Sequence, residues 1–112
     1  MHELSLAEGV VRIVLDSAKA ESFTRVRRLR LSASKLSGVE IPALRFALEA
    51  IVPGTPLDGA RIQIDEPPGC AWCFNCNANI EVASRLDACP RCGGHRYRAS
   101  EEGLRVVELE VD

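Results

Sequence analysis

Two stretches of the chain carry the spacing of an amphipathic helix. Near the start, apolar residues recur at steps of three and four positions, at Leu4, Ala7, Val10, Val11, Val14 and Ala18. This spacing places them on one face of a helix. A second helix is predicted to follow Pro42, because proline suits the first helical turn. Its buried face would carry Leu44, Ala47, Leu48 and Ile51. The Pro-Gly-Thr-Pro run at residues 53–56 ends it.

Three other stretches alternate apolar and polar residues, which predicts strands. In residues 25–33, Leu29, Leu31 and Ala33 point one way, whereas the opposite side carries Arg28, Arg30 and Ser32. Residues 60–65 and 107–111 alternate in the same manner. The basic side of the first strand suggests either an RNA-binding face or a solvated sheet face, and the second interpretation is favoured.

The order of these elements predicts an α+β fold, with two helices packed on a three-stranded sheet. Residues 65–69, Asp-Glu-Pro-Pro-Gly, mark a boundary beyond which cysteine, asparagine and turn residues dominate. The segment beyond it has too few large apolar residues to fold alone without a metal. We therefore expect residues 104–112 to return and complete the sheet under both helices. The predicted domains are 1–67 plus 104–112, and an inserted zinc-ribbon-like, four-cysteine lobe at 68–103.

Four cysteines in two C-x2-C pairs predict a zinc site. The pairs are Cys73 with Cys76, and Cys89 with Cys92. Each turn can point two thiolates at one ion, and two turns supply the tetrahedral sulfur set that structural Zn²⁺ prefers. Cys70 stands at the same spacing before Cys73, so a Cys70–Cys73 ligand pair is an open alternative. The run of three cysteines is also reminiscent of iron–sulfur spacing, although the distant second pair argues against a cluster.

The first three residues, Met1, His2 and Glu3, can form a second and harder metal site. The α-amine, the His2 amide nitrogen and the His2 imidazole can close small chelate rings on one ion, and the Glu3 amide or carboxylate can add a fourth donor. Nitrogen-rich tetragonal sites of this kind suit Ni(II) or Cu(II). The triplet lies at the leading end of the first helix, so we expect it to be exposed rather than packed. The alternative is an ordinary solvated histidine.

Four further side chains in the cysteine-rich segment could take part in the chemistry or the packing of the site. His95, just after the second cysteine pair, is either an exposed loop histidine or an additional, mobile ligand for nickel or zinc. Trp72, Phe74 and Tyr97 are expected to pack around the zinc knuckles rather than to bind anything.

Composition excludes several classes of function. The 112-residue chain has a formal charge of −2, which argues against generic nucleic-acid binding. No G-x4-G-K loop is present, and no nucleophile–base pair can be assembled, so we expect neither nucleotide hydrolysis nor another enzymatic activity. No signal peptide or membrane-spanning run is found, and we expect a cytoplasmic protein whose cysteines bind metal.

Taken together, these residues resemble the HypA/HybF family of hydrogenase nickel-incorporation proteins. The resemblance rests on the Met-His-Glu-Leu-Ser start, on Gly-Val-Glu at residues 38–40, on the two cysteine pairs and on the closing residues 104–111. The chain differs in having Ser34 where such proteins often have glycine, and in the extra Cys70. The resemblance favours Cys73 and Cys76 over Cys70 as ligands.

The resemblance implies a nickel metallochaperone with a structural zinc site. It would bind Ni(II) weakly enough to release it, work with a HypB-type GTPase, and deliver the ion to a hydrogenase large subunit as a monomer or weak dimer. Two other functions remain open from the residues alone. One is a zinc ribbon that binds a protein or nucleic acid, with His2 incidental, and the other is a rubredoxin-like electron carrier.

Overall fold

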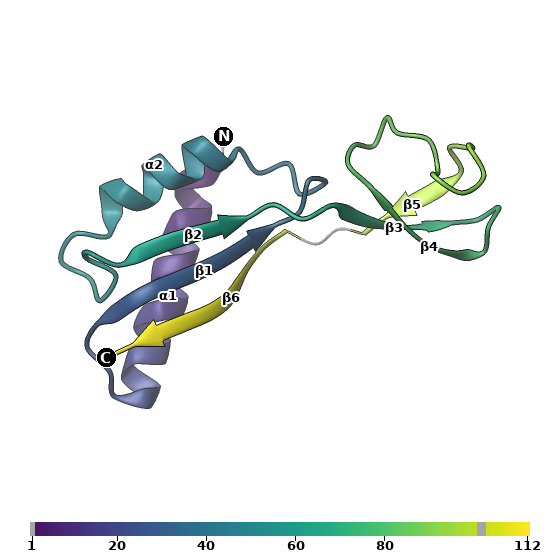
Figure 1. The fold of residues 1–112 in the computed structure, drawn as a ribbon. Coiled ribbons are helices and arrows are strands. Elements are labelled where there is room, and N and C mark those ends of the chain that lie inside the picture. The colour runs from purple at the N-terminus through teal and green to yellow at the C-terminus, as the bar shows by residue number, and fades with distance from the viewer. Residues whose placement is uncertain (1, 101–102) are drawn as a thin grey trace.

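The computed structural model describes residues 2–100 and 103–112 and shows an elongated molecule with two sheets (Figure 1). Its extents are 50 × 27 × 18 Å. The elements, in chain order, are α1 (Glu3–Glu21), β1 (Val26–Ala33), α2 (Ile41–Ile51), β2 (Arg61–Asp65), β3 (Gly69–Cys73), β4 (Ala78–Val82), β5 (Tyr97–Ala99) and β6 (Leu104–Val111). No helix among the described residues is both long enough and apolar enough to cross a membrane.

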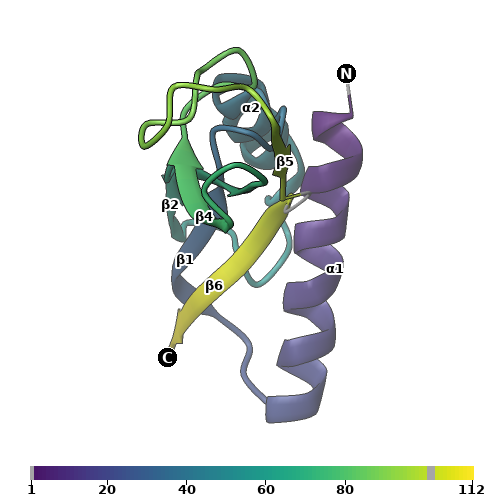
Figure 2. The ribbon, with the colours of Figure 1, turned by 90° about the vertical axis from the view of Figure 1, so that its right-hand side faces the viewer.

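The first sheet has the strand order β2-β1-β6, with β1 parallel to β2 and antiparallel to β6. Leu29 and Leu31 of β1 are fully buried, and they share one core cluster with Val14 of α1 and Leu48 of α2. Both helices therefore contribute to the core beside this sheet, and α1 lies to one side of the strands and crosses the direction of β6 at an angle (Figure 2). The last strand returns to the first sheet as expected, which confirms the predicted α+β fold.

The side of the first sheet that faces away from the core carries ion pairs between arginines of β1 and carboxylates of the neighbouring strands. Arg28 lies 2.5 Å from Glu108 and 2.6 Å from Glu110, and Arg30 lies 2.7 Å from Asp65. Exposed pairs of this kind contribute little stability each. They do neutralise the arginines of β1, however, so this surface is a solvated sheet face and not a basic footprint for RNA.

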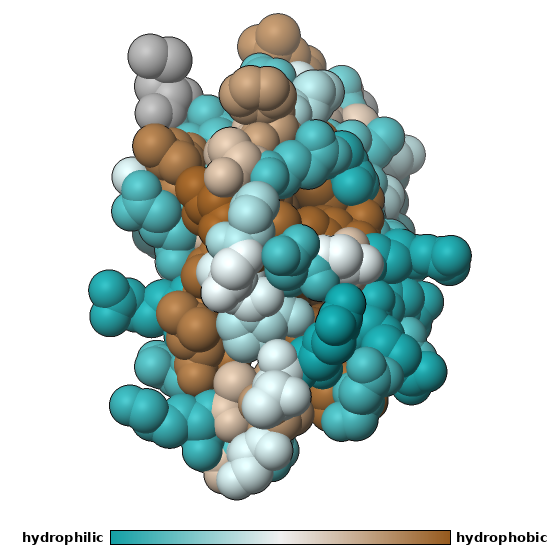
Figure 3. Space-filling view, turned by 90° about the vertical axis from the view of Figure 1, so that its left-hand side faces the viewer, coloured by the Kyte–Doolittle hydropathy of each residue, from teal (hydrophilic) through white to brown (hydrophobic). Residues whose placement is uncertain are grey.

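The far end of the molecule, opposite the second sheet, has a mixed surface. Figure 3 shows charged and polar side chains interrupting the apolar ones across this face.

The second sheet has the strand order β4-β3-β5 and is antiparallel throughout. The sequence of this segment predicted no strands, because cysteine, asparagine and turn residues dominate it. The sheet has a small core of its own, made of Leu36, Ala71, Cys73, Ile80, Val82 and Cys89. Two of these six residues are cysteines of the predicted zinc site, so little apolar material holds this lobe together.

Leu36 joins the two parts of the molecule. It comes from the loop between β1 and α2, yet its side chain is 8% exposed and belongs to the core of the second sheet. A Cβ atom at Gly69 would lie 2.2–2.8 Å from the Leu36 side chain, so only glycine allows this approach. The Lys35 N–H also donates to the Pro67 carbonyl at 2.9 Å. The domain boundaries at residues 67 and 104 stay a prediction. Leu36 belongs to the first predicted domain, but its side chain packs in the core of the second.

Removal of β6 should destabilise the whole first sheet. In a chain that ends at Gly103, the half-buried Leu104, Val106 and Leu109 are lost from the core. We expect a decrease in the free energy of unfolding of roughly 3 kcal/mol or more, measured by urea denaturation. A chain that ends at Val111 is the control, because it loses the exposed ion pair between Arg27 and Asp112 and the Asp112 N–H bond to the Arg25 carbonyl, but no residue of the core. Equal stability of the two truncated chains would contradict the role of β6.

Replacement of Gly69 should strain the junction between the two sheets. Gly69→Ala should lower the free energy of unfolding by about 1–3 kcal/mol, because the added methyl group overlaps Leu36. The double variant with Leu36→Ala should recover part of that loss in a double-mutant cycle. Gly9→Ala is the matched control, since no atom lies within 4 Å of its new Cβ and helices favour alanine. Additive effects in the cycle would show that the two residues do not interact.

Candidate functional site

Four cysteine sulfurs converge at one end of the second sheet. The Sγ atoms of Cys73 and Cys92 lie 3.7 Å apart, those of Cys76 and Cys89 lie 3.9 Å apart, and all four lie within 4.8 Å of one another. A tetrahedral ion with metal–sulfur bonds of about 2.3 Å needs sulfurs about 3.8 Å apart. The observed spacing therefore fits a zinc ion bound by four thiolates.

Backbone N–H groups shape the two turns that carry the sulfurs. The Cys76 N–H donates to Cys73 Sγ at 3.5 Å, and the Arg91 N–H donates to Cys89 Sγ at 3.4 Å. In the second turn the Gly93 N–H donates to the Cys89 carbonyl at 2.8 Å, and Gly93 has a φ of +74° that suits glycine. Each C-x2-C turn therefore presents its first sulfur to an N–H donor, which stabilises a thiolate.

The repulsion between the cysteine thiolates must be offset by a cation if all four are to be charged. Burial and the neighbouring sulfurs raise the pKa of the Cys76 thiol to about 12. Burial also acts to raise the pKa of Cys89, but N–H donors from Cys92 and Arg91 outweigh it and lower that pKa to about 6. Four thiolates at these distances repel one another, so the cluster cannot be fully deprotonated at neutral pH unless a metal offsets the charge.

Cys70 does not join this cluster. It lies on β3 opposite Glu81 and is exposed, whereas Cys73 on the same strand is fully buried. Because side chains alternate along a strand, residues three positions apart point to opposite faces. The structure brings together Cys73, Cys76, Cys89 and Cys92, and it leaves the alternative Cys70–Cys73 pair without geometric support.

The amino-terminal triplet is only partly exposed. Met1 lies outside the described residues. His2 precedes α1, is exposed, and its carbonyl accepts the Leu6 N–H at 2.9 Å, while no side-chain cap is formed. Glu3 is only 7% exposed, so the expectation that the triplet is exposed rather than packed is wrong for this residue.

The physical reason is that the Glu3 carboxylate has a partner. It accepts a hydrogen bond of 3.2 Å from the Glu40 N–H, at the residue that precedes α2. A hydrogen bond from the chain's amino terminus and this bond from Glu40 lower the pKa of Glu3 to about 2. The carboxylate therefore stays charged at neutral pH and fixes the leading end of α1 against the start of α2.

The remaining candidates in the second lobe are placed as follows. His95 is exposed, and it does not belong to the one group of three or more metal-ligating side chains found among residues 2–100 and 103–112. Tyr97 packs against the core of the second sheet as expected, and its hydroxyl donates toward the carbonyls of Ser84, Arg85 and Asp87.

Trp72 and Phe74 do not pack around the knuckles. They are 39% and 56% exposed, so the expectation is wrong for both. Trp72 lies between Ala71 and Cys73, whose side chains take the inner face of β3, and strand alternation turns Trp72 outward.

Sequence reasoning missed two residues that support these sites. Glu40 is 37 positions from Glu3, and its contribution is a backbone N–H that any residue type except proline could supply. Leu36 lies in a loop with no periodic pattern. Residues 38–40 contribute only to the family resemblance, and no pattern in the sequence predicts the contacts of Glu40 or Leu36.

Comparison with known proteins identifies the family. A family model described as hydrogenase/urease nickel incorporation, metallochaperone, hypA, matches residues 1–111. The hydrogenase maturation factor HypA of Azotobacter vinelandii is 48% identical over 113 residues, covering 100% of both chains. HypA of Cupriavidus necator is 52% identical, covering 100% of this chain and 95% of that protein.

A solved structure has the same fold. The solution structure of the Ni metallochaperone HypA from Helicobacter pylori matches with a TM-score of 0.73 at 17% identity, over 99% of this chain and 97% of that chain. With a converging four-cysteine cluster, a His2 that precedes α1 and a family match over nearly the whole sequence, the chain belongs to the HypA family of hydrogenase/urease nickel-incorporation metallochaperones.

Proposed function

We propose that this protein binds one Ni(II) ion at its amino-terminal end and delivers it for the maturation of [NiFe]-hydrogenase in the cytoplasm. The observation that carries the proposal is the separation of two unlike donor sets. The sulfurs gather in the second lobe, whereas His2 lies exposed at the start of α1 in the first. A soft, closed site suits a resident ion, and a nitrogen-rich, open site suits an ion that must leave.

Nickel would be held by nitrogen donors from the first residues. The ligands are the His2 imidazole, the His2 backbone nitrogen, the Met1 amine and the backbone nitrogen of Glu3. The first N–H groups of a helix have no carbonyl partner within the helix. The Glu3 carboxylate already accepts the Glu40 N–H, which favours the amide of Glu3 over its carboxylate as the fourth donor.

The zinc ligands in this proposal are Cys73, Cys76, Cys89 and Cys92. When bound, zinc supplies the positive charge that the four thiolates need, and much of the folding free energy of a lobe with a six-residue core. The distances between the sulfurs support this ligand set over any that includes Cys70. His95 is exposed near the second pair and is kept as an accessory nickel ligand only.

Transfer requires partners. The sequence has no loop that cradles nucleotide phosphates, so we assign nucleotide hydrolysis to a HypB-type GTPase that loads nickel or triggers its release. The hydrogenase large subunit would receive the ion. An exposed His2 leaves a path along which the next ligand set can approach.

The zinc site can be tested by removing single thiols. Cys89→Ser should lower the zinc content from one ion per chain toward zero and loosen the second lobe, measured by elemental analysis and by amide hydrogen exchange. Cys70→Ser is the matched control and should leave zinc in place, because its side chain is outside the cluster. An empty site in Cys70→Ser combined with a full site in Cys76→Ser would refute the ligand assignment.

The nickel site can be tested at His2 by isothermal titration of the zinc-loaded protein. His2→Ala should abolish nickel binding with the zinc site still full, because the two sites use different donors, and His95→Ala should have a smaller effect or none. A tag fused ahead of Met1 should weaken binding, since it converts the amine into an amide. Affinity should decrease as the pH falls, because imidazole and backbone nitrogens bind only when deprotonated. An untagged His2→Ala protein with wild-type affinity would remove the main support of the proposal.

A further inference from the structure

The exposed aromatic residues of the second sheet lie on one face together with arginines. On β3 this outer face carries Cys70, Trp72 and, just beyond the strand, Phe74. Trp72 is paired in register with Asn79 on one side and Arg98 on the other, and the Phe74 N–H donates to the Arg96 carbonyl at 2.9 Å. Glu81 of β4 is paired in register with Cys70 and is exposed on the same side as Asn79. We call these seven residues the outer face: Cys70, Trp72, Phe74, Asn79, Glu81, Arg96 and Arg98.

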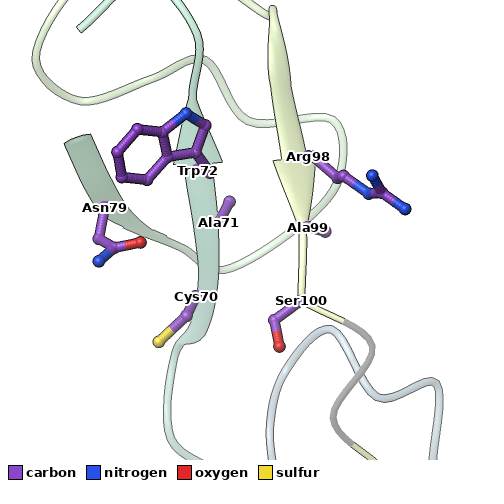
Figure 4. A pocket seen from close by; sticks show the side chains of 7 residues that line it. All are labelled: Cys70, Ala71, Trp72, Asn79, Arg98, Ala99 and Ser100. Carbon is purple, nitrogen blue, oxygen red and sulfur yellow. The ribbon is translucent and has the colours of Figure 1, made fainter. Parts of the chain in front are cut away.

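The outer face has the composition of a protein-binding surface. Tryptophan and arginine are two of the residue types enriched at binding hot spots, and both are exposed here. A shallow depression lies here, and its lining includes Cys70, Trp72, Asn79 and Arg98 (Figure 4). Figure 4 shows the Trp72 ring and Asn79 beside each other, with Cys70 farther along the strand. Trp72 and Phe74 are 39% and 56% exposed, so part of each aromatic side chain faces water in the free protein, and burial of that surface by a partner would be favourable.

The two arginines of the outer face form no ion pair within the part of the chain that the structure describes, with Glu81 or with another carboxylate. The arginines of β1 each have a carboxylate within 4 Å, as in Arg30 with Asp65. Arg96 and Arg98 have no such ion pair among residues 2–100 and 103–112, and both are exposed. A ligand for this face would therefore bring carboxylates of its own.

We propose that the outer face docks an acidic segment of the protein that receives the nickel. Apolar side chains of that segment would cover Trp72 and Phe74, and its carboxylates would pair with Arg96 and Arg98. This inference rests on the proposed function for the identity of the client. It adds a second contact, because the outer face lies in the lobe that does not carry His2.

Two other occupants are less compatible with the charges. A second copy of the chain, related by a two-fold axis through this face, would place the same arginines opposite one another, which costs energy. Single-stranded nucleic acid could stack on the aromatic rings. However, the chain has a formal charge of −2, and a four-thiolate zinc site adds further negative charge to the same lobe, so long-range attraction to phosphates is missing.

The test uses the full-length, zinc-loaded protein and the nickel-free hydrogenase large-subunit precursor as the probe. Binding is measured by isothermal titration for wild type, Trp72→Ala, Arg98→Glu and two controls. Phe46→Ala removes an aromatic side chain that is 75% exposed on α2, and Arg85→Glu makes the same charge change elsewhere in the second lobe. Zinc content and nickel titration are recorded for every variant, because Trp72 neighbours Cys73 in the chain.

We expect Trp72→Ala and Arg98→Glu each to weaken binding by about tenfold or more, the size of a hot-spot effect. The controls should stay within about twofold of wild type. Added salt should weaken precursor binding by the wild type more than precursor binding by the Arg98→Glu variant. Because the chain has one tryptophan, incorporated fluorotryptophan should give one fluorine NMR signal that shifts on addition of the precursor.

Several outcomes would overturn the inference. They are wild-type affinity in both outer-face variants, absence of precursor binding by the wild type, or a fluorine signal that shifts with an oligothymidine strand and not with the precursor. Failure of the proposed function is a separate result. It would appear as nickel binding that is unchanged in His2→Ala, and it can occur whether or not the outer-face variants lose the precursor.

Discussion

The mutual repulsion of four thiolates, and its relief by one cation, is the constraint on which the second lobe depends. The sulfurs of Cys73, Cys76, Cys89 and Cys92 lie within 4.8 Å of one another, and in that environment the pKa of Cys76 is raised to about 12. Without a metal the cysteines would take up protons, which relieves the repulsion, but the metal–thiolate bonds that draw the two turns together would be missing. The rest of the core contains only four other residues, so hydrophobic burial cannot take their place.

The loop between β1 and α2 carries the contacts that connect the two regions. Leu36 enters the core of the second sheet against Gly69, and four residues later the Glu40 N–H holds the Glu3 carboxylate. One short segment thus touches the lobe of the cysteine cluster and the helix that begins beside His2. The two lobes are therefore joined by packing in addition to the covalent links before β3 and after β5. That packing depends on the small size of Gly69, which no helical or strand pattern reveals.

The sequence predicted the parts of the fold that follow from periodicity. The apolar spacing of α1 and α2 and the alternation in β1, β2 and β6 each repeat over several residues, so they identify an element and its buried face. The strands β3–β5 are short and interrupted by cysteine and turn residues, which removes that signal. The functional residues were likewise predicted only where the sequence carries a regular spacing. Fixed spacing found the four cysteines, whereas the burial of Glu3 depends on a backbone group far along the chain. Trp72 and Phe74 were predicted to be buried because they are aromatic and lie near the cysteine pairs. That prediction was wrong, because side chains alternate along β3 and Trp72 falls on the outward side.

The charges suggest a reason why the aromatic side chains stay exposed. In the first sheet each arginine of β1 that lies near β6 or β2 has an acidic partner, and the surface is complete without a ligand. In the second sheet the inner face is occupied by the cysteine cluster, so stabilisation comes from the metal and not from a large apolar core. Trp72 is 39% exposed and lies outside the core of the second sheet. Burial of the remaining ring surface is left for another molecule, and in our proposal the neighbouring Arg96 and Arg98 set the charge of that molecule.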